Sequence, residues 1–250
     1  METNFAGENM NTEVLAVIWD YDGTLVDTRQ KNLNVTREIY NVVSGKSWEQ
    51  VPALASLENY RQVNREVVNW RELYTRAFGL SIAQTDRAGD LWVEFQQADK
   101  TATPTYEGIA EVLQALDDLP HGVVSQNSSA TIDEVLDRTG LAGHFQHVVG
   151  FEEVGYDNQK PAPDGLLLCL EKMSLTRDGL VFFIGDHEVD MQSAHNANHV
   201  LAARQQKPTF VTIGAMYDSG HNAEAWNFKP TYMAARAADI LQIVKPGKHS

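Results

Sequence analysis

A chain of 250 residues, 43% of them hydrophobic, can hold one large globular domain or one domain with a smaller second one. Its 34 acidic and 20 basic residues give a net charge of −14 at pH 7, which disfavours partners that are nucleic acids or anionic membrane surfaces. No apolar run approaches the length of a membrane span, and the single cysteine, Cys169, excludes an internal disulfide, so that we expect a reducing, cytoplasmic setting.

The first predicted element is a buried parallel strand over residues 14–19. Its sequence, VLAVIW, is a continuous apolar run with β-branched and aromatic residues. The segment Asp20-Tyr21-Asp22-Gly23-Thr24-Leu25 follows directly, so the strand brings two carboxylates to its carboxyl end, where open α/β sheets bind ligands. Asp and Gly also occur in ordinary turns, but paired carboxylates at this place favour a site for a divalent metal and phosphoryl transfer.

Residues 28–103 form the next predicted region, which is helical throughout. Apolar residues recur at spacings of three and four over 63–78, which predicts one helix, and again over 88–95, which predicts another. The region contains no convincing strand. We therefore expect a separate helical unit that is inserted after the first strand.

From residue 104 onward, strand and helix patterns alternate, which predicts a doubly wound parallel sheet of the α/β class. The expected domains are an α/β core of residues 12–27 and 104–250 and a helical domain of residues 28–103. Further elements are expected as strands at 121–125, 147–150, 180–186, near 200–201 and at 210–213, and as helices at 109–116, after Ser128 and from Pro163.

Polar residues stand at or just beyond four of the predicted strand ends. They are Asp20 with Asp22, then Ser125, then Lys160, and finally Asp186 with Asp190. Carboxylates that converge on one sheet edge repel each other unless a cation holds them, and a hard, oxygen-preferring ion such as Mg²⁺ removes that repulsion. Lys160 adds a fixed positive charge to this edge.

This arrangement resembles the haloacid dehalogenase superfamily of hydrolases, specifically its phosphoglycolate-phosphatase-like members with a small helical cap. The resemblance covers about residues 12–244. It rests on the sequence Asp20-x-Asp-Gly-Thr-Leu, on Ser125, on Lys160-Pro-x-Pro, and on Gly-Asp186-x-x-x-Asp. It implies a Rossmann-like core with an inserted, all-helical cap domain.

The resemblance also implies roles for the acidic residues. Asp20 would be the nucleophile that forms an aspartyl-phosphate, and Asp22 would protonate the leaving alcohol and then activate the hydrolytic water. The Mg²⁺ ion would be held by the Asp20 carboxylate, the main-chain carbonyl of Asp22, and Asp186. Asp190 would bind the ion directly or through a water molecule.

A second set of residues would bind the phosphate group. Ser125 and Lys160 would contact the phosphoryl oxygens and offset charge in the transition state, and Gln126 and Asn127 lie in the same loop. Family members often carry Asn directly after the Ser or Thr, whereas here Gln126 follows and Asn127 comes one residue later. This departure concerns the detailed phosphate contacts and removes no required group.

The expected function is that of a Mg²⁺-dependent phosphatase acting on a small phosphorylated metabolite. Two alternatives stay open: a phosphosugar mutase, and a non-catalytic regulatory protein that has kept the fold. The substrate and the oligomeric state are not indicated, because the selecting residues lie in the cap. The arginines of the cap have two possible roles, a solvated helix face, which is the more common one, or contact with the substrate. They are Arg29, Arg61, Arg65, Arg71 and Arg76, of which Arg61, Arg65 and Arg71 are the ones to vary.

The histidines show no evident metal-ligand spacing, so we expect solvated or core roles for them. The set is His121, His144, His147, His195, His199 and His221.

Overall fold

A computed structural model describes residues 12–67, 69–217 and 223–246 of the chain. The chain divides into two compact units, one made of residues 1–25 and 105–250 and the other of residues 26–104. We refer to them as the core unit and the inserted unit. No helix in the described ranges is long and apolar enough to cross a membrane.

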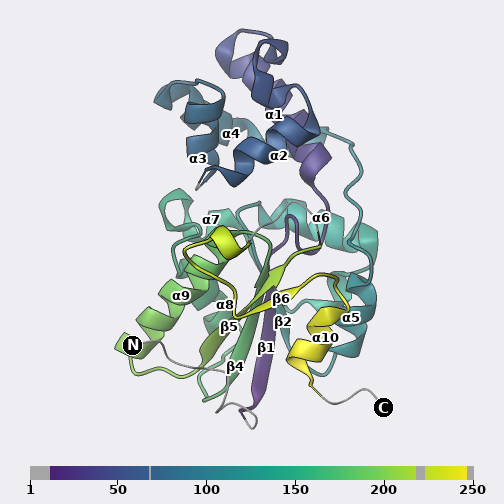
Figure 1. The fold of residues 1–250 in the computed structure, drawn as a ribbon, viewed down its shortest axis with the longest axis vertical. Helices are drawn as coiled ribbons and strands as arrows, with labels where there is room; N and C mark the ends of the chain where they lie inside the picture. The colour runs from purple at the N-terminus through teal and green to yellow at the C-terminus, as the bar shows by residue number, and fades with distance from the viewer. Residues whose placement is uncertain (1–11, 68, 218–222, 247–250) are drawn as a thin grey trace. The chain divides into compact units, whose positions relative to one another are not determined.

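One parallel sheet forms the centre of the core unit (Figure 1). Within the described residues its six strands have the order β3-β2-β1-β4-β5-β6, and every neighbouring pair is parallel. The chain therefore winds outward from β1 in one direction and then from β4 in the other, which confirms the predicted doubly wound α/β fold. The strands are β1 (Val14–Trp19), β2 (His121–Val124), β3 (His147–Val149), β4 (Leu180–Gly185), β5 (Thr209–Ala215) and β6 (Tyr232–Ala234).

The register of β1 and β4 determines where the chemistry-bearing residues emerge. Both strands are buried along almost their whole length, as continuous apolar runs require. Trp19 pairs with Ile184, and Val17 pairs with Phe182. The residues that follow each strand consequently leave the sheet side by side at its carboxyl edge.

Helices cover both faces of this sheet (Figure 1). Helices α8 and α9 pack on one face, where Leu166, Cys169 and Leu201 join strand residues in one buried cluster. Helices α5 and α10 lie on the other side of the sheet. The helices of this unit are α5 (Ile109–Ala115), α6 (Ser129–Thr139), α7 (Phe151–Val154), α8 (Asp164–Lys172), α9 (Glu188–Ala203) and α10 (Asp239–Val244).

Two details of the core unit differ from the sequence prediction. The strand expected near residues 200–201 is wrong, because these residues belong to α9, whose buried face includes Ala194, Ala197 and Leu201 at helical spacing. A run of two apolar residues fits a helix face as well as a strand. The edge strand β6 was not predicted, since its three residues are too few to show a period.

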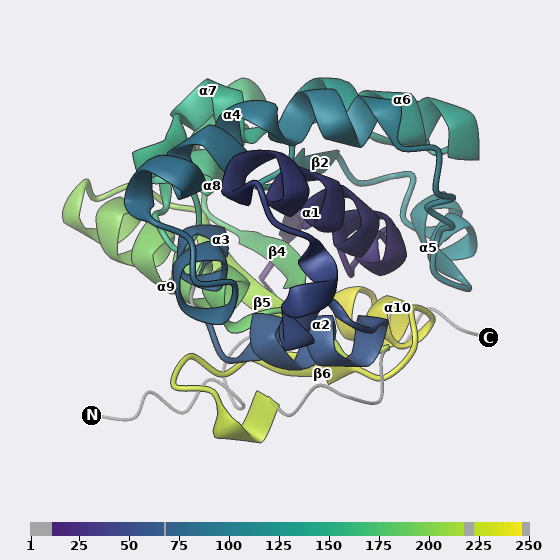
Figure 2. The ribbon, with the colours of Figure 1, turned by 90° about the horizontal axis from the view of Figure 1, so that it is seen from above.

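The inserted unit is entirely helical in its described part, and Figure 2 shows its helices from above. The predicted continuous helix over 63–78 is wrong: α2 ends at Arg65 and α3 begins at Trp70. Asn69 causes the break, because its extended backbone and its side chain, which accepts a hydrogen bond from Glu72 N, cap the new helix. The helices are α1 (Arg29–Ser44), α2 (Leu57–Arg65), α3 (Trp70–Glu72) with a π-helical turn over Leu73–Ala77, and α4 (Ile82–Ala98).

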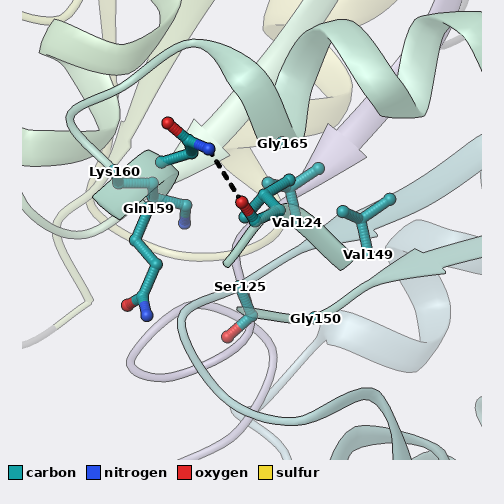
Figure 3. Close-up of a pocket in the computed structure, with 9 residues that line it drawn as sticks. Val124, Ser125, Val149, Gly150, Gln159, Lys160 and Gly165 are labelled. Carbon is teal, nitrogen blue, oxygen red and sulfur yellow. Dashed lines mark hydrogen bonds between the residues drawn. The ribbon is translucent and has the colours of Figure 1, made fainter. Parts of the chain in front are cut away.

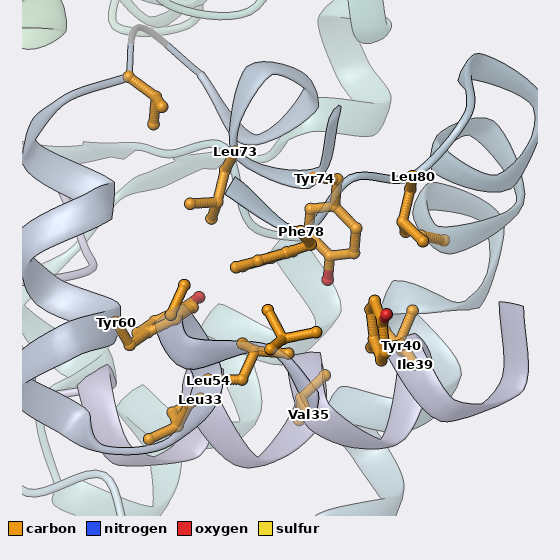
Figure 4. Close-up of a cluster of buried hydrophobic side chains, with 14 of the residues drawn as sticks. Leu33, Val35, Ile39, Tyr40, Leu54, Tyr60, Leu73, Tyr74, Phe78 and Leu80 are labelled. Carbon is orange, nitrogen blue, oxygen red and sulfur yellow. The ribbon is translucent and has the colours of Figure 1, made fainter. Parts of the chain in front are cut away.

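The inserted unit has a hydrophobic core of its own (Figure 4). Aromatic rings occupy its centre: Phe78 stacks on Tyr60 at a centroid distance of 6.5 Å and meets Tyr74 edge-on at 5.2 Å. Leu33 and Ile39 of α1 pack against this group. The apolar residues that recur over 63–78 therefore do belong to the core of this unit, although they do not lie on a single helix.

Hydrogen bonds connect the chain segments on either side of the two points where the insertion begins and ends, one bond within each unit. In the core unit, Tyr106 N donates to Leu25 O at 3.2 Å. In the inserted unit, Asp27 N donates to Pro104 O at 2.8 Å. The first and last residues of the insertion thus lie close together.

Candidate active site

Four charged side chains of the core unit converge at the carboxyl edge of the sheet. Asp20 directly follows β1, Asp186 directly follows β4, and Asp190 lies in the first turn of α9. Lys160 comes from the loop that precedes α8. Parallel strands place these groups together because their carboxyl ends share one edge.

Lys160 links two of the carboxylates. Its Nζ donates to Asp20 Oδ1 at 2.5 Å and to Asp190 Oδ1 at 2.7 Å. All three residues are buried, with 7%, 2% and 6% of Asp20, Asp190 and Lys160 exposed. Asp190 Oδ2 in turn accepts a hydrogen bond from His187 N at 3.0 Å, so the N-terminal cap of α9 holds this carboxylate in place.

A cluster of acidic oxygens lies next to this ion pair. One carboxylate oxygen from each of Asp20, Asp186 and Asp190 lies within 4.8 Å of the other two. Gly23, which has a φ of +81°, leaves the space for Asp186, since a Cβ at residue 23 would overlap the Asp186 carboxylate. Gly23, which follows Asp20 and Asp22 in the chain, therefore allows the Asp186 carboxylate to lie close to Asp20.

Burial and mutual repulsion raise the proton affinity of this cluster. The pKa of Asp20 rises to about 7, mainly because burial disfavours its charge, with Asp190 and Asp22 adding repulsion and Lys160 opposing the rise. The pKa of Asp186 lies well above its ordinary value for the same two reasons. Burial lowers the pKa of Lys160, but Asp190 and Asp20 outweigh this and raise it, so the ammonium keeps its charge.

The cluster suits a hard divalent cation. Its donors are carboxylate oxygens, which Mg²⁺ and Ca²⁺ prefer, and the charge of Lys160 cannot balance three neighbouring carboxylates. A divalent ion would relieve the repulsion that raises the pKa values of Asp20 and Asp186. The residues present therefore fit the metal that the sequence predicts.

The loop after β2 contributes neutral polar groups to the same edge. Ser125 follows β2 directly, its amide donates to Val149 O at 3.0 Å, and its Oγ accepts from Asn127 N at 3.1 Å. The amide of the Asn127 side chain reaches Asp22 Oδ2 at 3.5 Å. Gln126 instead donates to the main-chain oxygen of Lys160 at 2.9 Å, so its amide holds the lysine loop.

A small pocket lies between these loops (Figure 3). Ser125 and Gly150 line it from the ends of β2 and β3, and Gln159 and Lys160 line it from the loop before α8. Sequence reasoning missed Phe183, whose ring lies 5.2 Å from Lys160 Nζ. No signal distinguishes this phenylalanine from other apolar residues of its strand.

Two of the arginines considered for substrate contact have acidic partners inside the inserted unit. Arg61 lies 3.6 Å from Glu58, and Arg71 pairs with Asp86 while its guanidinium covers the Trp70 ring at 4.7 Å. Arg65 is exposed at the end of α2. Arg65 and Arg71 therefore fit a solvated helix face, whereas only 20% of the Arg61 side chain is exposed. A role of these residues in substrate selection stays a prediction.

Comparison with known proteins agrees with this geometry. A model of the haloacid dehalogenase-like hydrolases matches residues 17–203, well over half of the chain. The match includes the second half of β1, the whole of β4 and all four charged side chains of the cluster. The chain belongs to the haloacid dehalogenase-like hydrolases, and it is an enzyme of that family.

Individual relatives cover most of the chain at low identity. The pyrophosphatase PpaX of Listeria monocytogenes is 26% identical over 94% of this chain and 99% of its own. The N-acetylmuramic acid 6-phosphate phosphatase of Pseudomonas aeruginosa is 29% identical over 75% of this chain and 80% of its own. A solved haloacid dehalogenase-like hydrolase of Streptococcus pneumoniae has a TM-score of 0.69 at 16% identity, covers 93% of this chain and 99% of its own, and shares the fold.

Proposed function

We propose that the protein is a Mg²⁺-dependent phosphatase that hydrolyses a small phosphorylated metabolite through an aspartyl-phosphate on Asp20. The observation that carries the proposal is the meeting of Asp20, Asp186 and Asp190 within 4.8 Å, with the Lys160 ammonium bonded to two of them. A cluster with this charge suits a cation and a substrate with negative oxygens. The names of the relatives, a pyrophosphatase and a sugar-phosphate phosphatase, support this substrate class.

The metal would be held by the carboxylates of Asp20, Asp186 and Asp190 and by the main-chain oxygen of Asp22. When bound, the ion would neutralise charge on the phosphoryl oxygens and lower the pKa of Asp20, so that this carboxylate is ionised. Lys160 would remain an ammonium and bind a phosphoryl oxygen, since the pKa of this group is raised.

In the first half of the reaction, an Asp20 carboxylate oxygen attacks phosphorus and forms the aspartyl-phosphate. The bond between phosphorus and the alkoxide oxygen of the substrate breaks, and Asp22 gives its proton to that oxygen so that an alcohol leaves. Ser125 and Asn127 would contact the phosphoryl group from the β2 loop. Asn127 lies beside Asp22, which supports a joint action of the two loops.

In the second half, water attacks the phosphorus of the aspartyl-phosphate. Asp22, now a carboxylate, accepts the proton of that water, and the bond between phosphorus and the Asp20 oxygen breaks. The products are inorganic phosphate and the regenerated Asp20 carboxylate. Asp22 thus ends the cycle with the proton that it needs for the next substrate.

The inserted unit is proposed to act as a cap that selects the leaving group and excludes bulk water. Remote contacts select a substrate, whereas the groups of the core unit carry the chemistry. Arg61, Arg65 and Arg71 are the residues to vary in a test of this role. We also propose a cytoplasmic location, on the buried single thiol of Cys169.

A screen of phosphorylated metabolites tests the proposal. The purified protein is incubated with Mg²⁺ and with phosphoglycolate, pyrophosphate, sugar phosphates or nucleotide monophosphates, and inorganic phosphate is measured. Release of stoichiometric phosphate from at least one compound, abolished by Asp20→Asn, supports a phosphatase. Isomerisation of a sugar phosphate that needs a bisphosphate activator and releases little phosphate would instead establish a mutase. If the protein shows neither phosphatase nor mutase activity on any compound of the panel, that result would favour a regulatory protein.

A further inference from the structure

We propose that His195 and His199 bind one divalent transition-metal ion of the kind that prefers imidazole, such as Ni²⁺ or Cu²⁺, on the exposed face of α9. This site shares no residue with the acidic cluster. The sequence interpretation treated the histidines as scattered and overlooked these two, which stand four residues apart within one helix.

The helix holds the two side chains on one face. Residues at positions i and i+4 are neighbours on a helix surface, and both histidines are exposed. The opposite face of α9 is fixed in the protein core through Ala194, Ala197 and Leu201. Two imidazole rings on a fixed helix lose little conformational freedom when they bind a common ion, which favours chelation.

The distances between the rings match a chelate. An ion bonded to two imidazole nitrogens at about 2.0–2.1 Å, with a right angle between the bonds, holds those nitrogens about 2.9 Å apart. The ring centroids, roughly 1.1–1.2 Å behind each nitrogen, would then stand about 4.5 Å apart. In the structure, His195 Nε2 and His199 Nε2 are 2.9 Å apart and their ring centroids are 4.5 Å apart.

This geometry favours certain metals over others. Right angles between nitrogen ligands are typical of the tetragonal coordination of Cu²⁺ and Ni²⁺. A tetrahedral zinc site would need the two nitrogens about 3.3–3.4 Å apart, so Zn²⁺ would have to move the rings. Mg²⁺ prefers oxygen ligands and would not compete for the pair.

The protonation of the rings and their neighbouring groups allow an ion to bind. In the metal-free pair one Nε2–H donates to the other Nε2. In the chelate the donor ring takes its other tautomer, so that both rings carry their proton on Nδ1 and both Nε2 lone pairs bind the ion, with no net change in protons. Phe228 packs against His195 at a centroid distance of 5.2 Å and limits the rotation of this ring. The net charge of −14 attracts cations to the surface in general.

Calorimetry on the full-length protein without an affinity tag tests the proposal. Ni²⁺ is titrated in the presence of excess Mg²⁺, which occupies oxygen sites, into the wild type, H195Q, H199Q and the control H144Q. We expect one site in the wild type and in H144Q, and at least about tenfold weaker binding in H195Q and in H199Q, because a single imidazole loses the chelate effect. Equal affinity in all four proteins, or no binding to the wild type, would overturn the proposal.

Electron paramagnetic resonance with one equivalent of Cu²⁺ gives a second readout. The wild type should show coupling to two equatorial nitrogens, and each single variant should show one. A wild-type spectrum identical to that of H195Q and H199Q would also contradict the chelate. Circular dichroism establishes that the variants are folded, which their exposed positions lead us to expect.

Discussion

Gly23 lies directly against the Asp186 carboxylate, so that a β-carbon at residue 23 would occupy the same space as Asp186 Oδ2. The contact joins the turn after β1 to the residue after β4. Any residue with a β-carbon at position 23 would therefore displace the Asp186 carboxylate from the acidic cluster. Such a substitution provides a way to disturb the cluster without removing a charge.

Gly23→Ala should abolish most activity and raise the concentration of Mg²⁺ needed for half-maximal rate, because Asp186 is displaced. Gly79→Ala is a matched control: Gly79 has a similar φ of +70°, but nothing lies within 4 Å of its β-carbon position. Both variants should lose about 1–2 kcal/mol of unfolding free energy through backbone strain. Equal activities of the two variants would show that the contact with Asp186 is unimportant.

Removal of the metal should stop turnover. We expect excess EDTA to abolish the hydrolysis of an aryl phosphate ester and added Mg²⁺ to restore it, because Asp20, Asp186 and Asp190 crowd negative charge that one ammonium cannot balance. Far-ultraviolet circular dichroism with and without EDTA controls for unfolding. Full activity in the presence of the chelator would refute the metal assignment.

The two carboxylates after β1 should differ in their effects. Asp20→Asn removes the nucleophile and should leave almost no activity, whereas Asp22→Asn should lower kcat by roughly 10²–10⁴-fold through lost acid and base catalysis. The loss for Asp22→Asn should shrink with a leaving group that needs no proton, such as a nitrophenol. Equal losses over a series of leaving groups would argue against the acid role of Asp22.

Lys160→Met should destabilise the protein as well as inactivate it. The variant leaves Asp20 and Asp190 buried without their ammonium partner, which typically costs about 3–5 kcal/mol of unfolding free energy. Added Mg²⁺ should recover part of the stability but not the activity. Lys172→Met, which breaks a partly exposed pair with Glu153, is the control and should cost no more than about 1 kcal/mol in chemical denaturation.

His121 should make the protein less stable in acid. Trp19 Nε1 donates to His121 Nδ1 at 2.9 Å, and His121 Nε2 donates to Leu116 O at 3.0 Å, so the buried ring is neutral. Burial lowers its pKa below the ordinary 6.5, and the unfolded chain therefore takes up the proton first as the pH falls. Its contribution to stability is complete above pH 6.5 and declines below it.

Denaturation of the wild type and of His121→Gln between pH 5 and pH 8 measures this effect. The glutamine can accept from Trp19 and donate to Leu116 without titrating, so the stability advantage of the wild type should narrow as the pH falls. A difference that stays constant over this range would mean that His121 has the same pKa in the folded and unfolded chain.

The sequence predicted the centre of the molecule better than its periphery, for physical reasons. Residues 14–19 and 180–185 are continuous apolar runs with β-branched and aromatic residues, which favours buried central strands, and the polar residues after parallel strands meet at one edge. The break at Asn69 could not be predicted from periodicity, because a capping side chain competes with an apolar stripe that fits either arrangement. The strand expected near 200–201 failed on a similar ambiguity.

The sequence could predict which residues lie in the site, but it could not predict which of them form hydrogen bonds and ion pairs with one another. Strand ends bring Asp20 and Asp186 to one edge. The bonds of Lys160 to both Asp20 and Asp190 depend instead on a loop and a helix cap that no spacing encodes. The amide of Gln126 bonds to the lysine loop for the same reason. Tertiary contacts of this kind follow only from the folded chain.

Because the ends of the insertion lie close together, the inserted unit could be deleted and the core unit closed with a short linker. Because Leu25 and Tyr106 are hydrogen-bonded to each other, a few flexible residues could replace the 79 residues of Val26–Pro104 without stretching the chain. The same connection would let helical inserts of other lengths be exchanged at this point, because the two attachment residues are bonded directly to each other. An exchange of the insert would leave the cluster of Asp20, Asp186, Asp190 and Lys160 in the chain, because all four residues belong to the core unit.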